Sequence, residues 1–153
     1  MNKKKLIREQ LDTSLQRFRP LMDITAPPKG WIRAIRNALG MTARQLSERL
    51  GVSQQSVARI EKEEMPGAVT IKTMRRIADS LDCVFVYGFV PRTSMKDTIS
   101  HQAKQVAARQ LSKASQTMSL ENQALSKEEN ERAVSDLVDD LIRTLPSNLW
   151  NKL

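Results

Sequence analysis

The sequence predicts a mainly α-helical protein: a small bundle of four helices, one β-strand, and further helices toward the C-terminus. Apolar residues recur at helical spacing through residues 31–81, where Ser or Thr stands before several segments as a capping residue. Residues 83–90 form a β-branched and aromatic run, which favours a strand. Residues 94–124 are polar and contain no Gly or Pro, which favours a long helix.

Residues 1–30 are predicted to be a helix followed by a linker arm. Residues 3–18 place four apolar side chains on one helical face, and a proline ends that helix. The first helix of the predicted bundle is Trp31–Leu39, and the last spans about 70–81. Residues 31–81 therefore form one predicted domain.

Residues 42–61 are typical of two short helices joined by a tight turn. Thr42 is placed to cap the first helix, and Gly51 stands where that helix must end and the backbone can take a positive φ. Ser53 is placed to cap the second helix, residues 54–62. The apolar residues that make the two helices face each other are Leu46, Leu50, Val57 and Ile60.

The outward side of the second helix carries groups that can read DNA. Gln54 and Gln55 can each bond an adenine edge in two places, Arg59 can bond a guanine edge, and an α-helix fits the major groove. The segment therefore predicts a helix-turn-helix that reads double-stranded operator DNA, with a helical hairpin packed in a core as the alternative. The predicted DNA-binding residues, including arginines near the phosphates, are Arg33, Arg36, Thr42, Arg44, Gln45, Ser53, Gln54, Gln55, Ser56 and Arg59.

Two resemblances follow from these residues. Gln45-Leu46-Ser47, Leu50-Gly51-Val52-Ser53, Val57 and Ile60-Glu61 resemble the helix-turn-helix of phage repressor-type regulators, the Cro/C1-like family. The longer run from LDTSLQRFRP through APPKGWIRAIRNALGMTARQL to LDCVFVYGFVPR is similar to the proteins called mobile mystery protein A. Those are helix-turn-helix proteins encoded beside a Fic-domain partner, which implies that this chain is a transcriptional repressor and an antitoxin.

The predicted strand at 83–90 cannot satisfy its own backbone groups, because the sequence offers no second convincing strand. Pairing with the same strand of a second copy, across a two-fold axis, solves this problem. Residues 82–91 are therefore predicted to join a homodimer. The alternative is an extended segment docked on its own chain.

Residues 92–153 are predicted to be a C-terminal helical region. Ser126 and Glu129 fit a capping box that opens a last helix, which ends near Leu145. One face of that helix is apolar enough to need burial against the preceding helix or a partner.

A second motif lies in this region, at Thr117, Glu121 and Asn122. It fits (Ser/Thr)-x-x-x-Glu-(Gly/Asn), which resembles the inhibitory helix of proteins that silence Fic-domain adenylyltransferases. In that family the Glu pairs with an Arg of the toxin's ATP site and takes the space of the γ-phosphate. The alternatives are an ordinary polar helix end and, for the whole chain, a helix-turn-helix regulator with no toxin-inhibiting role.

Composition narrows the function further. The net charge is +8 and is uneven: residues 1–113 carry 21 Lys/Arg against 10 Asp/Glu, which favours phosphate-bearing partners. One cysteine and one histidine cannot make a disulfide or a conventional zinc site. No nucleophile–base set or Gly-rich phosphate loop is present, so we expect neither an enzyme nor a cofactor. The sequence contains no stretch apolar enough for a membrane span and no signal-peptide core, so a cytoplasmic protein is expected.

Overall fold

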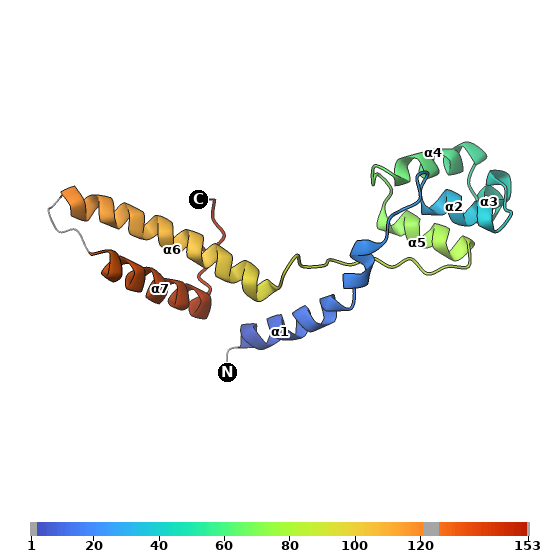
Figure 1. Cartoon of the computed structure of the whole chain (residues 1–153). Helices are drawn as coiled ribbons and strands as arrows, with labels where there is room; N and C mark the ends of the chain where they lie inside the picture. The colour runs from blue at the N-terminus through green and yellow to red at the C-terminus, as the bar shows by residue number, and fades with distance from the viewer. Residues whose placement is uncertain (1–2, 121–125, 153) are drawn as a thin grey trace. The chain divides into compact units, whose positions relative to one another are not determined.

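The computed structural model describes residues 3–120 and 126–152, and the chain divides into two compact units. One unit is Arg17–Val90; the other joins Met1–Gln16 to Pro91–Leu153. All regular elements of the described residues are helical, so the mainly α-helical class is confirmed (Figure 1). They are α1 (Lys3–Gln16), the 3-10 helix η1 (Arg19–Asp23), α2 (Trp31–Ala38), α3 (Ala43–Leu50), α4 (Gln54–Glu64), α5 (Ile71–Ser80), α6 (Met95–Leu120) and α7 (Lys127–Thr144).

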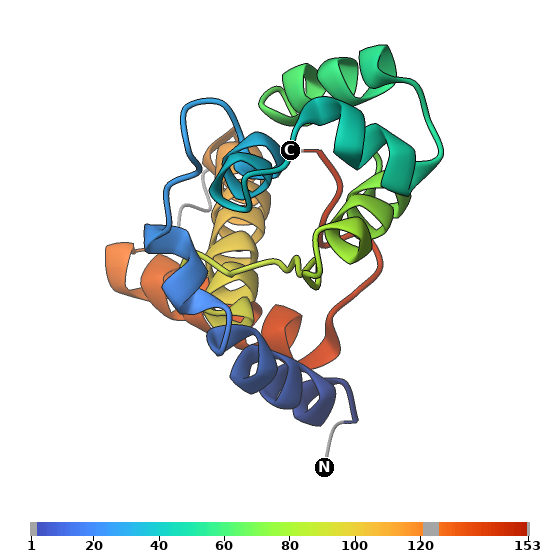
Figure 2. The ribbon, with the colours of Figure 1, turned by 90° about the vertical axis from the view of Figure 1, so that its right-hand side faces the viewer.

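In the unit Arg17–Val90, α2 to α5 enclose a small aliphatic core. α4 packs against α2 and α3, and α5 packs against α3 (Figures 1 and 2). The buried members of this core are Ile32, Leu46, Leu50, Val57, Ile77 and Leu81. The predicted four-helix bundle is confirmed, because the helical spacing of these apolar residues turns them all toward one centre.

A polar link that the sequence did not suggest joins the start of α2 to the end of α4. The carboxylate of Glu64 accepts the backbone N–H groups of Trp31 at 2.8 Å and Ile32 at 3.0 Å. It therefore caps α2, whose first N–H groups have no partner within the helix. Gly30, with φ of 84°, is needed at this place because a Cβ there would lie 2.5 Å from Glu64 Oε2.

The strand predicted at residues 83–90 is wrong for the single chain. These residues form a drawn-out segment after α5 that belongs to no sheet (Figure 1). Within the described residues, Cys83 N–H donates to the Ala78 carbonyl at 2.8 Å, and no backbone hydrogen bond involves residues 84–90. The physical reason is that a strand is defined by its ladder, and the described chain supplies no second strand to form one.

The other unit is built on the antiparallel pair of α6 and α7, which lie side by side (Figures 1 and 2). Ala103 and Ala107 of α6 are completely buried, so α7 can approach closely. Ser126 and Glu129 form the predicted capping box of α7. α1 packs beside α6, where Met95 N–H donates to Asp12 Oδ1 at 2.9 Å. No helix within residues 3–120 and 126–152 is long and apolar enough to cross a membrane.

Candidate DNA-binding site

Three local features set the start of α3, the turn after it and the start of α4. Thr42 and Gln45 cap α3 reciprocally: Thr42 Oγ1 accepts the Gln45 N–H at 3.1 Å, and Gln45 Oε1 accepts the Thr42 N–H at 2.8 Å. Gly51 ends α3 in the left-handed conformation, with φ of 66°, which a side chain would disfavour. Ser53 Oγ then accepts the Ser56 N–H at 3.1 Å and starts α4. The turn predicted from these residues is confirmed.

The packing of α4 decides which of its residues face outward. Val57 and Glu61, four positions apart, are buried on the inner side of the helix. Gln55, Arg59 and Lys62 follow one another at spacings of four and three, are all exposed, and therefore share an outer face.

The carboxamides at the tip of α4 are available to an external partner. Gln54 and Gln55 both lie on the surface, and no hydrogen bond engages either side chain within the part of the chain that the structure describes. Ser56 is different, because its hydroxyl lies 2.8 Å from that of Ser53 and belongs to the helix cap. The tip of α4 can thus reach a base edge with two flexible amides, each of which can donate and accept a hydrogen bond.

The predicted phosphate contact at Arg36 is wrong, because this side chain is buried in an internal ion pair. Arg36 is 8% exposed and Glu61 is 8% exposed. Arg36 Nε lies 2.6 Å from Glu61 Oε1 and Arg36 Nη2 lies 3.1 Å from Glu61 Oε2, a paired arrangement that joins α2 to α4. Arg36 Nη1 also donates to the Met41 carbonyl at 3.0 Å. The hydrogen bond with Glu61 raises the pKa of the Arg36 guanidinium above its ordinary value, so this arginine stays charged.

The other predicted phosphate contacts remain on the surface. Arg33, three residues before Arg36 on α2, is exposed. Arg44 is exposed at the start of α3 and forms a 3.0 Å ion pair with Glu48. Arg59, which is predicted to bond a guanine edge, lies 4.0 Å from Glu63 in a loose exposed pair. Such exposed pairs contribute little to stability, so the arginine side chains can exchange a carboxylate for DNA at small cost.

Two further cations were missed by the sequence reasoning. Lys29 and Lys62 line the same hollow as Arg33, beside the buried pair of Arg36 and Glu61. The hollow has a volume of about 530 Å³, and its rim is basic. Lys29 precedes α2 and Lys62 stands near the end of α4, so nothing in the sequence placed them together. They are candidates for contact with the DNA backbone.

The second motif lies at the edge of the described residues. Thr117 is exposed on α6, and its Oγ1 donates to the Lys113 carbonyl at 3.1 Å. Glu121 and Asn122 lie outside the described residues. Within the described ranges, no group of three or more His, Cys, Asp or Glu side chains could hold a metal ion.

Comparison with known families identifies the class of this domain. Residues 32–85 match the family described as Helix-turn-helix. The match begins at the second residue of α2, covers α3 to α5 and ends inside the drawn-out segment. This part of the chain is therefore a helix-turn-helix domain of the type found in DNA-binding transcription regulators. No curated protein and no solved structure matches the chain significantly.

Proposed function

We propose that this chain is the antitoxin of a type II toxin–antitoxin pair. In this proposal it binds double-stranded operator DNA through α4, and it inhibits a Fic-domain adenylyltransferase toxin through residues 117–122. The observation that carries the DNA-binding part is the exposed pair of carboxamides, Gln54 and Gln55, at the tip of a helix whose inner face is fixed by Val57 and Glu61. The toxin-binding part is supported by the motif and by the resemblance to mobile mystery protein A.

Operator recognition combines two kinds of contact. The tip of α4 enters the major groove, where a Gln side chain can bond the N6 and N7 atoms of an adenine together. Arg33 and the lysines that share its hollow contact phosphates and fix the position of the helix on the duplex. Base contacts then supply the sequence preference, and the phosphate contacts supply affinity for any DNA.

We expect Gln54→Ala and Gln55→Ala each to cost about 1–3 kcal/mol of specific binding, because each removes a bidentate base contact. Fluorescence anisotropy with a duplex from the region upstream of the gene, and with a random duplex of equal length, measures the effect. Arg33→Ala is the matched control: it should weaken both duplexes alike and reduce the salt slope by about 1. Equal losses on both duplexes from the Gln substitutions would count against base reading.

Toxin inhibition depends on a carboxylate that imitates a phosphate. A carboxylate can accept two parallel hydrogen bonds from a guanidinium, as a phosphate does. Thr117 and Glu121 are four positions apart, the spacing at which two side chains of a helix share a face and can enter one pocket. Thr117 already stands exposed on α6.

We expect Glu121→Gly to release the toxin while DNA binding is unchanged. Truncating one partner of a buried, hydrogen-bonded charge pair costs about 2–5 kcal/mol of binding free energy. The assay is adenylylation by the co-purified neighbouring gene product, with anisotropy on the operator in parallel. Glu128→Gly, at an exposed carboxylate in the first turn of α7, is the control and should inhibit like the parent. Full neutralisation by the Glu121 variant would exclude the motif from inhibition.

We also propose that the chain acts as a homodimer joined through residues 83–90. The support is that residues 84–90 form no backbone hydrogen bond within the described chain, while four of their apolar side chains are exposed: Val84, Val86, Tyr87 and Phe89. Unpaired backbone beside apolar side chains is a ready template for pairing with another chain. A two-fold dimer also suits a pseudo-palindromic operator with two half-sites.

A helix-turn-helix regulator with no toxin-inhibiting role is the second candidate. The family match over residues 32–85 supports this candidate as much as the antitoxin, because the match concerns DNA binding alone. The Glu121→Gly experiment separates the two candidates, since a plain regulator has no toxin activity to release.

A further inference from the structure

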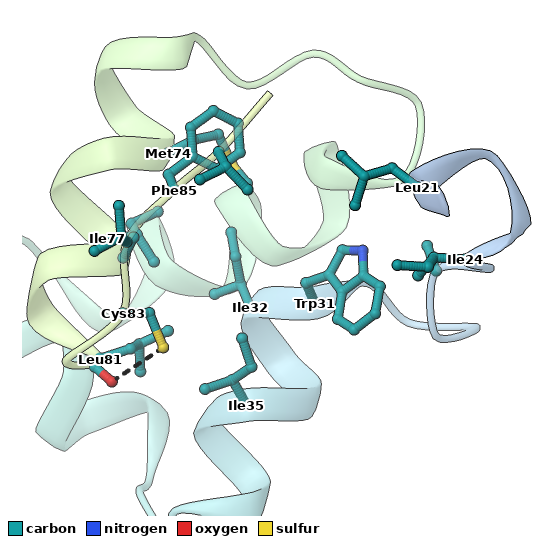
Figure 3. Close-up of a pocket in the computed structure, with 14 residues that line it drawn as sticks. Leu21, Ile24, Trp31, Ile32, Ile35, Met74, Ile77, Leu81, Cys83 and Phe85 are labelled. Atoms are coloured by element: carbon teal, nitrogen blue, oxygen red, sulfur yellow. Dashed lines mark hydrogen bonds between the residues drawn. The ribbon is translucent and has the colours of Figure 1, made fainter. Parts of the chain in front are cut away.

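An apolar cavity lies in the unit Arg17–Val90, beneath the start of the drawn-out segment (Figure 3). Its volume is about 480 Å³, as large as many small-molecule sites. Figure 3 shows Trp31 and Ile24 on one side, Met74 and Phe85 on the other, and Ile32 between them. The lining is almost entirely aliphatic and aromatic, so the cavity suits an uncharged apolar group and offers no anchor for a charge.

The segment above the cavity has two distinct faces. Phe85 and Tyr87 point to the side of α5, because their rings stack with centroids 6.0 Å apart and the guanidinium of Arg75 lies 5.7 Å from the Tyr87 centroid. Cys83 and Phe85 are half-buried, whereas Val84 and Val86 are exposed, although all four of these residues line the cavity. This alternation with period two is that of an extended backbone, so Phe89 belongs to the face of the odd-numbered residues.

Phe89 is an apolar side chain that its own chain leaves exposed to water. It is 81% exposed, more than either of the neighbouring aromatic residues of the segment. A benzyl group exposed to water beside other exposed apolar side chains indicates an intermolecular contact.

The symmetry of a dimer decides where Phe89 goes. In an antiparallel pair related by a two-fold axis, the axis is perpendicular to the ribbon, so each residue stays on the same face in both copies. Directly opposed residues share a face, so an odd-numbered residue must oppose an odd-numbered one. If the two copies of residues 83–90 pair along their length, the axis lies at one of the two middle residues, Val86 or Tyr87. In these two registers Phe89 opposes Cys83 or Phe85 respectively, and both of these residues line the cavity.

We propose that Phe89 of the partner subunit fills this cavity in the homodimer, so that each copy completes the apolar core of the other. This inference rests on the proposed dimerisation through residues 83–90. The contact is reciprocal, as a two-fold interface requires. It also connects dimer formation to the helix-turn-helix domain, because the walls of the cavity include Trp31 of α2 and Met74 of α5.

The test uses the intrinsic fluorescence of the full chain. The sequence has two tryptophans, so a Trp150→Phe background leaves Trp31, in the cavity wall, as the reporter. Sedimentation velocity gives the dimer dissociation constant, and Trp31 emission is followed over the same concentrations. We expect the emission to shift to shorter wavelength as the dimer forms, because the partner's Phe89 displaces water from the indole.

Phe89→Ala should raise the dimer dissociation constant about 30-fold or more, as loss of a central aromatic anchor does, and abolish the Trp31 shift at equal dimer occupancy. Its high exposure means that the substitution leaves the monomer fold intact. Leu39→Ala is the control: Leu39 is 55% exposed and does not line the cavity, so its loss should leave both the dimer dissociation constant and the Trp31 shift unchanged.

Two results would overturn the inference in different ways. If Phe89→Ala dimerises as strongly as the parent and shows the same Trp31 shift, the proposed contact between Phe89 and the cavity is wrong, but dimerisation through residues 83–90 can still be right. A parent chain that stays monomeric throughout removes both. The apolar dye 8-anilinonaphthalene-1-sulfonate gives an independent reading: its binding should fall as the dimer forms. Dye bound equally by monomer and dimer would show a cavity that the partner's Phe89 does not enter.

Discussion

Arg36→Ala is expected to lower the free energy of unfolding of the unit Arg17–Val90 by about 3–5 kcal/mol, because it leaves the Glu61 carboxylate buried without its partner. The variant also removes the hydrogen bond to the Met41 carbonyl, which lies in the connection between α2 and α3. Urea unfolding of the Trp150→Phe background, followed by the emission of Trp31, measures this unit specifically.

Two controls give this experiment a clear outcome. Arg33→Ala, an exposed arginine of the same helix, should change stability by less than about 0.5 kcal/mol. The double substitution Arg36→Met with Glu61→Leu should recover most of the loss, because it removes both buried charges together and fills a similar volume. An Arg36→Ala protein that unfolds like the parent, yet binds DNA with a reduced salt slope, would restore Arg36 as a phosphate contact.

Leu46→Ala is expected to cost about 2–5 kcal/mol of stability in the same unit. Leu46 is 0% exposed at the centre of the core, where α3 meets α4 and α5, and its removal leaves a cavity among residues that can relax only in part. DNA binding should be lost at a lower temperature than in the parent, since α4 keeps its orientation only through this packing.

Leu39→Ala is the control for the core substitution. Leu39 is 55% exposed just after α2, so its truncation should cost less than about 0.5 kcal/mol. Emission of Trp150 in a Trp31→Phe background reports the other unit, whose core is formed by α6, α7 and Leu149. A Leu46→Ala protein with unchanged urea midpoint for Trp31 would contradict the assignment of Leu46 to the centre of the core.

Much of the helix-turn-helix domain could be predicted from local rules. Thr42, Ser53 and Thr70 each accept the backbone N–H three residues ahead, as caps do, and Gly51 takes the left-handed conformation that ends α3. Caps and helical periodicity depend on near neighbours in the chain, so the sequence displays them directly. The exposed position of Gln54 and Gln55 follows from the same periodicity.

The errors arose where the deciding contact joins residues far apart in the chain. Arg36 looked like one of several basic residues on a helix, and Glu61, 25 positions later, makes it a buried structural group. Lys29 and Lys62 meet around one hollow for the same reason. Ala103 and Ala107 escaped notice because small residues carry little hydrophobic signal, although they let α6 and α7 pack closely.

The sequence by itself determined the helices, their caps, the turn and the outward tip of α4, because each of these depends on residues within four or five positions of one another. Tertiary structure alone decided that the Arg36 guanidinium is internal, that Glu64 caps α2, and that residues 84–90 leave their backbone unpaired beside an apolar cavity. Burial and pairing are properties of the folded chain: the free energy of a charge or an unpaired amide depends on which distant groups replace the water around it.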